Sequence, residues 1–165
     1  MRARDIMTKN PECCRRDNTA RDAARVMRDR DVGCVPIVDD GGRVVGIVTD
    51  RDLTVRGIAS GKDSSTKLND LMTPMASCSG QDDDLRDVEQ KMAELQVRRI
   101  PIVDAGGRCL GIISQADIAR AASLDDGMVT EQEIALVVEQ ISQPAGRGRA
   151  RSEPAVEETE ATPQF

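Results

Sequence analysis

The chain has 165 residues, with 23 Lys and Arg against 29 Asp and Glu, so its net charge at pH 7 is −6. Phe165 is its one aromatic residue and it has no histidine. An acidic chain without a basic block or rings for base stacking is not expected to bind nucleic acid. No apolar run is long enough to span a bilayer, and none resembles a signal peptide. We therefore expect a cytoplasmic protein that does not bind membranes.

The first half of the chain predicts an extended segment, a helix, two strands and a second helix. Met7-Thr8 leads towards a proline, which favours extended chain. Apolar spacing predicts a helix over 20–31. Residues 35–38 and 44–48 are β-branched and almost wholly apolar, as in strands buried on both faces, and the Asp-Asp-Gly-Gly between them predicts a tight hairpin turn. A helix over 50–60 follows.

The second half repeats this pattern at an offset of 65 residues. Aligning 5–54 with 70–119 gives 19 identities in 50 positions without a gap. The repeat predicts a helix over 85–96, strands over 100–103 and 110–113, and a helix opened by Ser114. Units this short bury little surface alone, so we expect the two copies to pack together. We assign one unit to 3–62 and the other to 68–128, with a polar linker between them.

The region after the second copy predicts a helix and then a tail. Thr130-Glu131-Gln132-Glu133 has the pattern of a capping box. Apolar residues at helical spacing then predict a helix over 130–142, which either packs back on the domain or contributes to a dimer contact. Residues 143–165 consist mostly of Gly, Arg, Ser, Glu, Pro, Thr and Ala, with little that could form a core, so we expect them to be disordered.

Together these motifs resemble the cystathionine-β-synthase (CBS) domain: Met-Thr, a helix, then Val-x-x-Val-Pro-Ile-Val-Asp-x-Gly-Gly-Arg-x-x-Gly-Ile-Val-Thr-x-x-Asp. Two copies in tandem resemble a Bateman module. The resemblance implies an α+β fold of two β-α-β-β-α units packed sheet to sheet with pseudo-twofold symmetry. It also implies two clefts that bind adenosyl compounds such as AMP, ADP, ATP, NAD or S-adenosylmethionine, and assembly into homodimers.

The end of each repeat carries the residues that could bind such a ligand. Thr49 and Ser114 lie at strand-to-helix junctions, where free backbone N–H groups favour an anion such as phosphate. Asp52 and Asp117, one turn later, could accept hydrogen bonds from the vicinal hydroxyls of a ribose. These residues could equally be ordinary helix caps. Gly46 and its equivalent would admit a ligand or another backbone close to the strand. The candidate set, with adenine expected near 32–36 and 97–101, is Thr49, Asp50, Arg51, Asp52, Ser114, Asp117, Pro36, Pro101 and Arg99.

The two clefts should have unequal preferences, because Arg51 is replaced by Ala116 in the second copy while Arg98 and Arg99 are added there. We find no catalytic constellation and therefore expect a non-catalytic regulatory protein that senses an adenine nucleotide and acts on an unidentified target. One alternative is a dimeric interaction scaffold that binds no ligand. A third hypothesis is redox or metal sensing through Cys13, Cys14 and Cys78, although no cysteine pair has the spacing of a zinc or redox motif.

Overall fold

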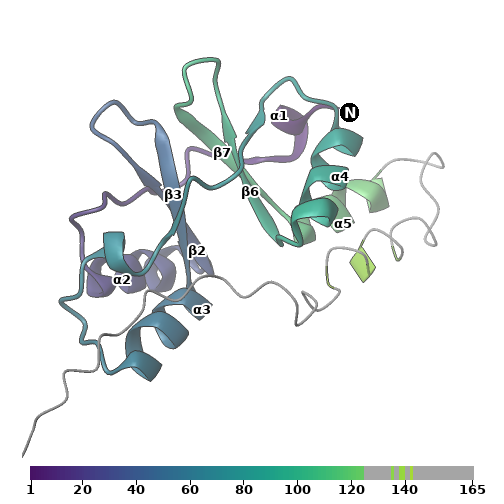
Figure 1. Ribbon diagram of the computed structural model, residues 1–165. Coiled ribbons are helices and arrows are strands. Elements are labelled where there is room, and N and C mark those ends of the chain that lie inside the picture. The colour runs from purple at the N-terminus through teal and green to yellow at the C-terminus, as the bar shows by residue number, and fades with distance from the viewer. Residues whose placement is uncertain (125–134, 136–137, 140–141, 143–165) are drawn as a thin grey trace, which may run out of the picture.

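The structure is a computed structural model that describes residues 1–124, 135, 138, 139 and 142. These residues form two similar α+β units that lie side by side, each with a small sheet and helices (Figure 1). None of the described helices is long and apolar enough to cross a membrane. Except for four residues, the helix expected over 130–142 lies outside the described part, as does the whole tail expected over 143–165.

The first unit contains helix α2 (Ala20–Arg30) and the antiparallel strands β2 (Cys34–Val38) and β3 (Val44–Thr49). The helix expected over 50–60 is present, but its geometry changes along its length. It begins as α3 (Asp50–Asp52), widens into a π-helical turn at Leu53–Gly57 and tightens into a 3₁₀ turn at Ile58–Ser60. The sequence pattern gives the helical extent but not these departures from α geometry.

The second unit contains α4 (Leu85–Leu95), the antiparallel strands β6 (Arg99–Val103) and β7 (Cys109–Ser114), and α5 (Gln115–Leu124). Both long helices stop where the sequence predicts, because Asp31 and Gln96 adopt the left-handed conformation that ends a helix. The Gly-Gly hairpin turns are confirmed, with positive φ at Gly42 and Gly107. The two hairpins touch at their tips, where the Val44 N–H donates to the Gly107 carbonyl at 3.0 Å.

The edges of the two sheets are exchanged between the repeats. After α1 (Ala3–Ile6), strand β1 (Thr8–Lys9) pairs with β7, giving the order β1-β7-β6-β5, in which β5 is Ser79–Gly80. Strand β4 (Thr73–Pro74), which follows a 3₁₀ turn at Leu68–Asp70, pairs instead with β3 of the first unit. Each repeat therefore contributes its opening Met-Thr segment to the sheet of the other, which connects the two units.

Each unit has its own aliphatic core. Ala3 of the opening segment packs in the second core with Val88, Met92, Ile100, Ile102 and Ile113. Leu68 and Met72 from the start of the second repeat pack in the first core with Ala23, Val35, Ile37 and Val48.

The strand exchange explains the glycines in the second strand of each repeat. A Cβ at Gly46 would lie 2.8 Å from the Thr73 carbonyl oxygen and 2.9 Å from the Met72 sulfur, and one at Gly111 would lie 2.4 Å from the Met7 sulfur. The sequence suggested that these glycines make room either for a ligand or for another backbone segment. In the structure they make room for the exchanged strand and its methionine.

Candidate ligand-binding cleft

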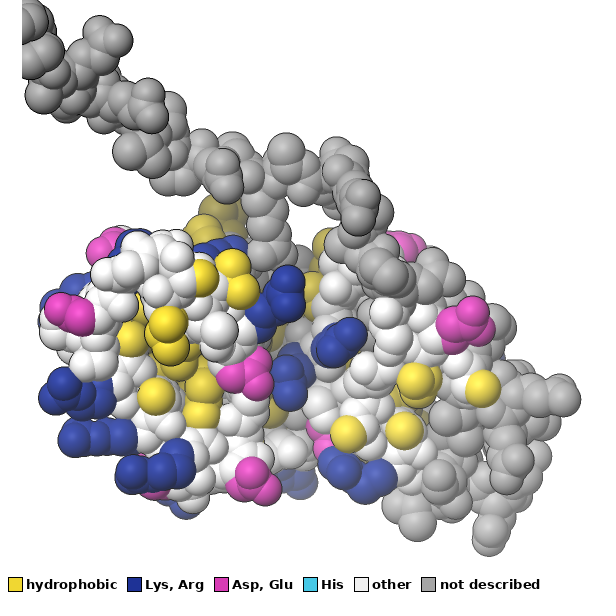
Figure 2. All heavy atoms as spheres, turned by 90° about the horizontal axis from the view of Figure 1, so that it is seen from below, with side chains coloured by type: hydrophobic (Ala, Val, Ile, Leu, Met, Phe, Trp, Pro, Cys, Tyr) yellow, Lys and Arg dark blue, Asp and Glu magenta, His cyan; other side chains and the backbone are white. Residues whose placement is uncertain are grey.

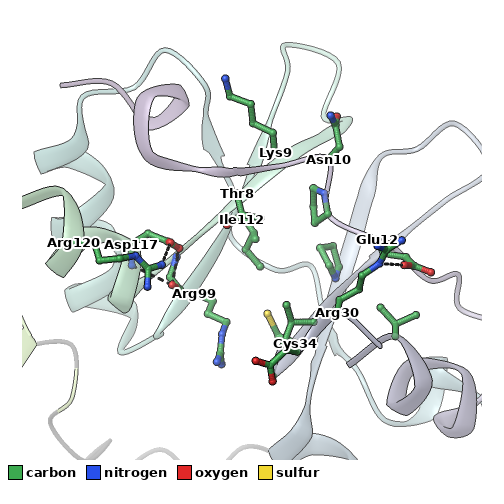
Figure 3. A pocket seen from close by; sticks show the side chains of 17 residues that line it. Thr8, Lys9, Asn10, Glu12, Arg30, Cys34, Arg99, Ile112, Asp117 and Arg120 are labelled. Carbon is green, nitrogen blue, oxygen red and sulfur yellow. Dashed lines mark hydrogen bonds and ion pairs between the residues drawn. The ribbon is translucent and has the colours of Figure 1, made fainter. Parts of the chain in front are cut away.

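A cavity of about 700 Å³ lies between the two units (Figure 3). Its walls come from the N-terminal segment, from α2 and β2 of the first unit, and from β6, β7 and α5 of the second unit. Four members of the sequence-predicted set line it: Pro36, Arg99, Ser114 and Asp117. The cavity therefore joins the hydroxyl and carboxylate of the second repeat to the apolar strand of the first, a combination across repeats that the sequence did not specify.

Ser114 and Asp117 form a capping box at the start of α5. The Asp117 Oδ2 atom accepts hydrogen bonds from the Ser114 N–H at 2.8 Å and from its hydroxyl at 2.6 Å. The other carboxylate oxygen, Oδ1, accepts from Arg120 at 2.5 Å. Asp117 is buried, whereas the Arg120 side chain is 70% exposed. The capping role and the position on the cavity wall thus coexist in the same two residues.

The wall opposite this pair is mainly apolar and comes from the first unit. Val26, Val32, Cys34 and Pro36 contribute to it, and Ile112 of β7 continues it on the second unit. Burial raises the pKa of the Cys34 thiol to about 11, so this side chain is a neutral group at physiological pH. A flat, uncharged ring such as a nucleobase suits a surface of this kind.

Positive charge lies at the junction of the units. Arg99 reaches from β6 towards Gly33, where a Cβ would lie 3.0 Å from its Nη2 atom and 3.0 Å from the Asp50 Oδ2 atom. Gly33 therefore allows a cation and an anion to approach the backbone of the first unit together. Arg30 and Arg120 flank the cavity on either side, and Figure 2 shows Lys and Arg side chains gathered around the junction.

The N-terminal segment forms a wall that the sequence reasoning missed. Residues 8–12 line the cavity, and Glu12 accepts a hydrogen bond from Arg30 at 2.7 Å. This segment lies here because β1 pairs with β7, with Thr8 opposite Ile112. The repeated Met-Thr pair marks this segment in the sequence. Its position beside the cavity depends on the strand exchange, which the sequence does not show.

The equivalent residues of the first repeat do not line this cavity. Thr49 and Asp52 form a matching capping box, with the Thr49 hydroxyl 2.8 Å from Asp52 Oδ2. Arg56 lies 3.5 Å from Asp52 Oδ1 and donates to the carbonyl oxygens of Leu71 and Met72 at 2.9 and 2.8 Å. The space beside Asp52 is therefore occupied by a cation of the protein itself.

The remaining predicted residues have separate surroundings. Arg51 is exposed, Pro101 is buried, and Asp50 lies beside Gly33. Arg15, near the start of the first repeat, pairs with Asp40 in the first hairpin turn. Within the described residues, no cluster of three or more Cys, Asp or Glu side chains is placed to hold a metal ion.

Comparison with known proteins agrees with this architecture. The CBS domain model matches residues 3–56 and 68–124. The hypoxic response protein 1 of Mycobacterium tuberculosis is 36% identical over 119 residues, 72% of this chain and 82% of that protein. The uncharacterized protein YlbB of Bacillus subtilis is 39% identical over 117 residues, 70% of this chain and 78% of that protein.

Solved structures of similar proteins include ligand complexes. Arabidopsis thaliana CBSX2 in complex with AMP gives a TM-score of 0.68 at 28% identity, covering 76% of this chain and 98% of that one. The CBS domain pair of protein MJ0100, in complex with 5′-methylthioadenosine and S-adenosyl-L-methionine, also gives 0.68, at 26% identity, with 74% and 96% covered. Hypoxic response protein 1, solved with two coordinated zinc ions, gives 0.67, with 73% and 98% covered. The repeats, the fold and these matches together show that the chain belongs to the CBS domain family, as a tandem pair.

Proposed function

We propose that the chain is a non-catalytic regulatory protein that binds an adenosyl compound in the cavity between its units. The observation that carries the proposal is the meeting, in about 700 Å³, of a hydroxyl–carboxylate pair at a helix N-terminus, three arginines and an apolar wall. This volume and mixture of surfaces suit a nucleotide-sized ligand. The AMP and S-adenosylmethionine complexes of similar CBS pairs support the same ligand class.

The cavity suggests how each part of the ligand would be held. Adenine would lie against Val32, Pro36 and Ile112. A ribose hydroxyl would donate to Asp117 Oδ1 in place of Arg120, whose exposed side chain is free to swing towards a phosphate. Ser114 and the N-terminus of α5 would add donors for that phosphate. Because arginine pairs strongly with phosphate, we expect AMP, ADP, ATP or NAD to bind more tightly than S-adenosylmethionine.

We further propose one ligand site per chain. The first repeat retains the hydroxyl and carboxylate, but Arg56 already occupies the space beside Asp52 and bonds to two backbone carbonyls. A ligand at that position would have to displace a cation whose partners would be left unpaired. The expectation of two unequal pockets thus becomes a proposal of one open and one closed cleft.

Ligand binding would regulate by bridging the two units or two copies of the chain. A ligand shifts such an equilibrium only by its difference in affinity between the states. We propose a cytoplasmic homodimer, and the exposed Val55 and Ile58 on the helical segment after β3 are candidates for its contact. The regulated target would be a separate protein.

The test is calorimetry with AMP, ATP, NAD and S-adenosylmethionine on the full chain and on two matched variants. Asp117→Asn should weaken binding about tenfold or more, the value of a hydrogen bond to a charged group. Asp52→Asn makes the same change in the capping box of the other repeat and should leave affinity within about twofold. Melting temperatures of the two variants control for the weakened caps, each of which should cost at most about 1 kcal/mol.

Each outcome decides a separate part of the proposal. If none of the four compounds binds below millimolar concentration, ligand sensing is wrong and the interaction scaffold becomes the better hypothesis. If the two variants lose affinity equally, both clefts bind and the single-site proposal is wrong.

A further inference from the structure

The C-terminal segment, of which the structure describes residues 135, 138, 139 and 142, is attached to the second unit by one glutamine. Gln115, the first residue of α5, donates from its Nε2 atom to the Val138 carbonyl at 3.0 Å and to the Ser142 hydroxyl at 2.7 Å. A side-chain amide has two N–H hydrogens, one for each of these bonds. Val138 and Ser142 are helical and four residues apart, so they share one face of a helix, and Val138 is half-buried. The segment therefore presents two oxygen atoms to the start of α5, below which Figure 1 shows it.

The attachment point adjoins the polar end of the cavity. Ser114, immediately before Gln115, lines the cavity, and so does Arg99, which lies opposite Ser114 in the pairing of β6 with β7. The Gln115 N–H donates to the Arg98 carbonyl at 3.0 Å, which fixes the start of α5 against β6. The N-terminus of a helix carries partial positive charge and attracts anions. The start of α5 is therefore next to both the segment and the position proposed for a ligand phosphate.

The segment brings oxygen atoms and negative charge to this position. A carbonyl and a hydroxyl oxygen accept the two bonds from Gln115, and Glu139, which follows Val138, adds an exposed carboxylate to the same segment. Negative charge near the N-terminus of α5 is favourable, whether it comes from these groups or from a phosphate. The two sources repel each other when both are present. The segment and a phosphate therefore compete for one electrostatically favourable position.

A carboxylate takes the place of this amide in the first repeat. The residue equivalent to Gln115 is Asp50, which has no side-chain hydrogen to donate and accepts from the Arg51 N–H at 2.7 Å. A carboxylate in the first turn also interacts favourably with the helix dipole, so it suits this position by itself. The amide of the second repeat gives up that advantage, and the two bonds that it donates to the C-terminal segment explain why.

We propose that the start of α5 is a docking site for the C-terminal segment, and that the docked segment and a ligand phosphate exclude each other. The docking rests on the two hydrogen bonds, whereas the choice of a nucleotide as the competitor rests on the proposed function. Adenosine fits the cavity without displacing the segment, while the phosphates of ATP extend towards it. Docking lowers the apparent affinity for ATP, because only molecules with a released segment bind it. ATP in turn releases the segment, so the occupancy of the cavity changes the surface of the protein.

NMR spectra of the full chain test the docking without any ligand. Gln115→Met keeps the length of the side chain and removes both donors, and Gln90→Met makes the same change on the exposed face of α4. Three amide signals report on the segment, those of Val138, Glu139 and Ser142. We expect them to move towards random-coil positions in Gln115→Met and to stay in place in Gln90→Met. Unchanged signals in Gln115→Met, or equal shifts in the two variants, would overturn the docking. Melting curves check that both variants are folded.

Calorimetry with adenosine and ATP tests the exclusion. Loss of the two hydrogen bonds should raise the affinity of Gln115→Met for ATP about fivefold or more, while its affinity for adenosine should stay within about twofold of the wild type. A general effect on the cavity would change both affinities alike. Equal changes for the two compounds, or an unchanged affinity for ATP, would therefore overturn the exclusion.

Inorganic tripolyphosphate separates this proposal from the proposed function, because it carries the phosphates of ATP without the adenosyl group. Added to the wild type, it should shift the three amide signals in the same direction as Gln115→Met does. If no adenosyl compound binds, the proposed function is wrong and the tripolyphosphate spectra still decide the exclusion, which signals that stay in place would refute. If the nucleotides bind but the three signals never move, the proposed function stands and the exclusion is wrong.

Discussion

Arg56→Met should destabilise the protein far more than Arg120→Met, although both arginines lie beside the carboxylate of a repeat. The Arg56 side chain is 30% exposed, and its Nη1 atom donates to the Leu71 and Met72 carbonyls at 2.9 and 2.8 Å. These carbonyls belong to the buried segment that leads into β4. Methionine keeps the length of the side chain but removes the donors, so both acceptors lose their partner.

The magnitude follows from the number and type of bonds lost. A hydrogen bond to a charged group contributes about 1.5–3 kcal/mol, and the two bonds share one nitrogen, so we expect a loss of about 2–4 kcal/mol. For a chain of this size, 1 kcal/mol corresponds to roughly 2–4 °C in melting temperature, which gives a decrease of about 4–16 °C. Arg120 pairs with Asp117 while 70% exposed, so its replacement should cost at most about 1 kcal/mol.

The assay is urea denaturation of the three proteins at equal concentration, with melting curves as a second measurement. The closing role of Arg56 would be refuted by equal stabilities of the two variants. Nucleotide calorimetry on Arg56→Met adds a direct check of the closed cleft. A second binding site in that variant would support Arg56 as the group that occupies it.

Three further predictions concern other positions. Gly111→Ala places a methyl group 2.4 Å from the Met7 sulfur and should lower the free energy of unfolding, measured by urea denaturation, by about 1–3 kcal/mol. An equally large loss when the substitution is made in Met7→Ala would show that the contact with Met7 is not the cause. Met75 has a positive φ of 49° and is 89% exposed, so Met75→Gly should raise stability by about 1 kcal/mol, and a decrease would show that its side chain has a role. Burial raises the pKa of Cys34 from its ordinary 9.0 to about 11, so its neutral form favours folding fully below pH 9 and progressively less towards pH 11. Raising the pH from 9 to 11 should therefore lower the free energy of unfolding of Cys34→Ala less than that of the wild type, as measured by urea denaturation at each pH. Equal losses in the two proteins would show that Cys34 does not contribute to this pH dependence.

The sequence predicted the secondary structure well because its signals are local. Helix ends at Asp31 and Gln96 and turns at the Gly-Gly pairs depend on backbone conformation within a few residues. The π-helical turn at Leu53–Gly57 has no such signal. The capping boxes of Thr49 and Ser114 were also readable, since a hydroxyl and a carboxylate three residues apart form them without help from the rest of the fold.

By itself the sequence determined two repeats, an aliphatic core in each unit and the residues that end each repeat. Tertiary structure alone decided the pairing of the repeats, because exchange of β1 and β4 depends on contacts between segments far apart in the chain. That exchange brings residues 8–12 and the apolar wall of the first unit to Ser114 and Asp117. It also brings the Leu71 and Met72 carbonyls to Arg56. Two nearly identical motifs thus acquire different surroundings, since the local sequence forms the same cap twice while distant residues determine which cap faces an open cavity.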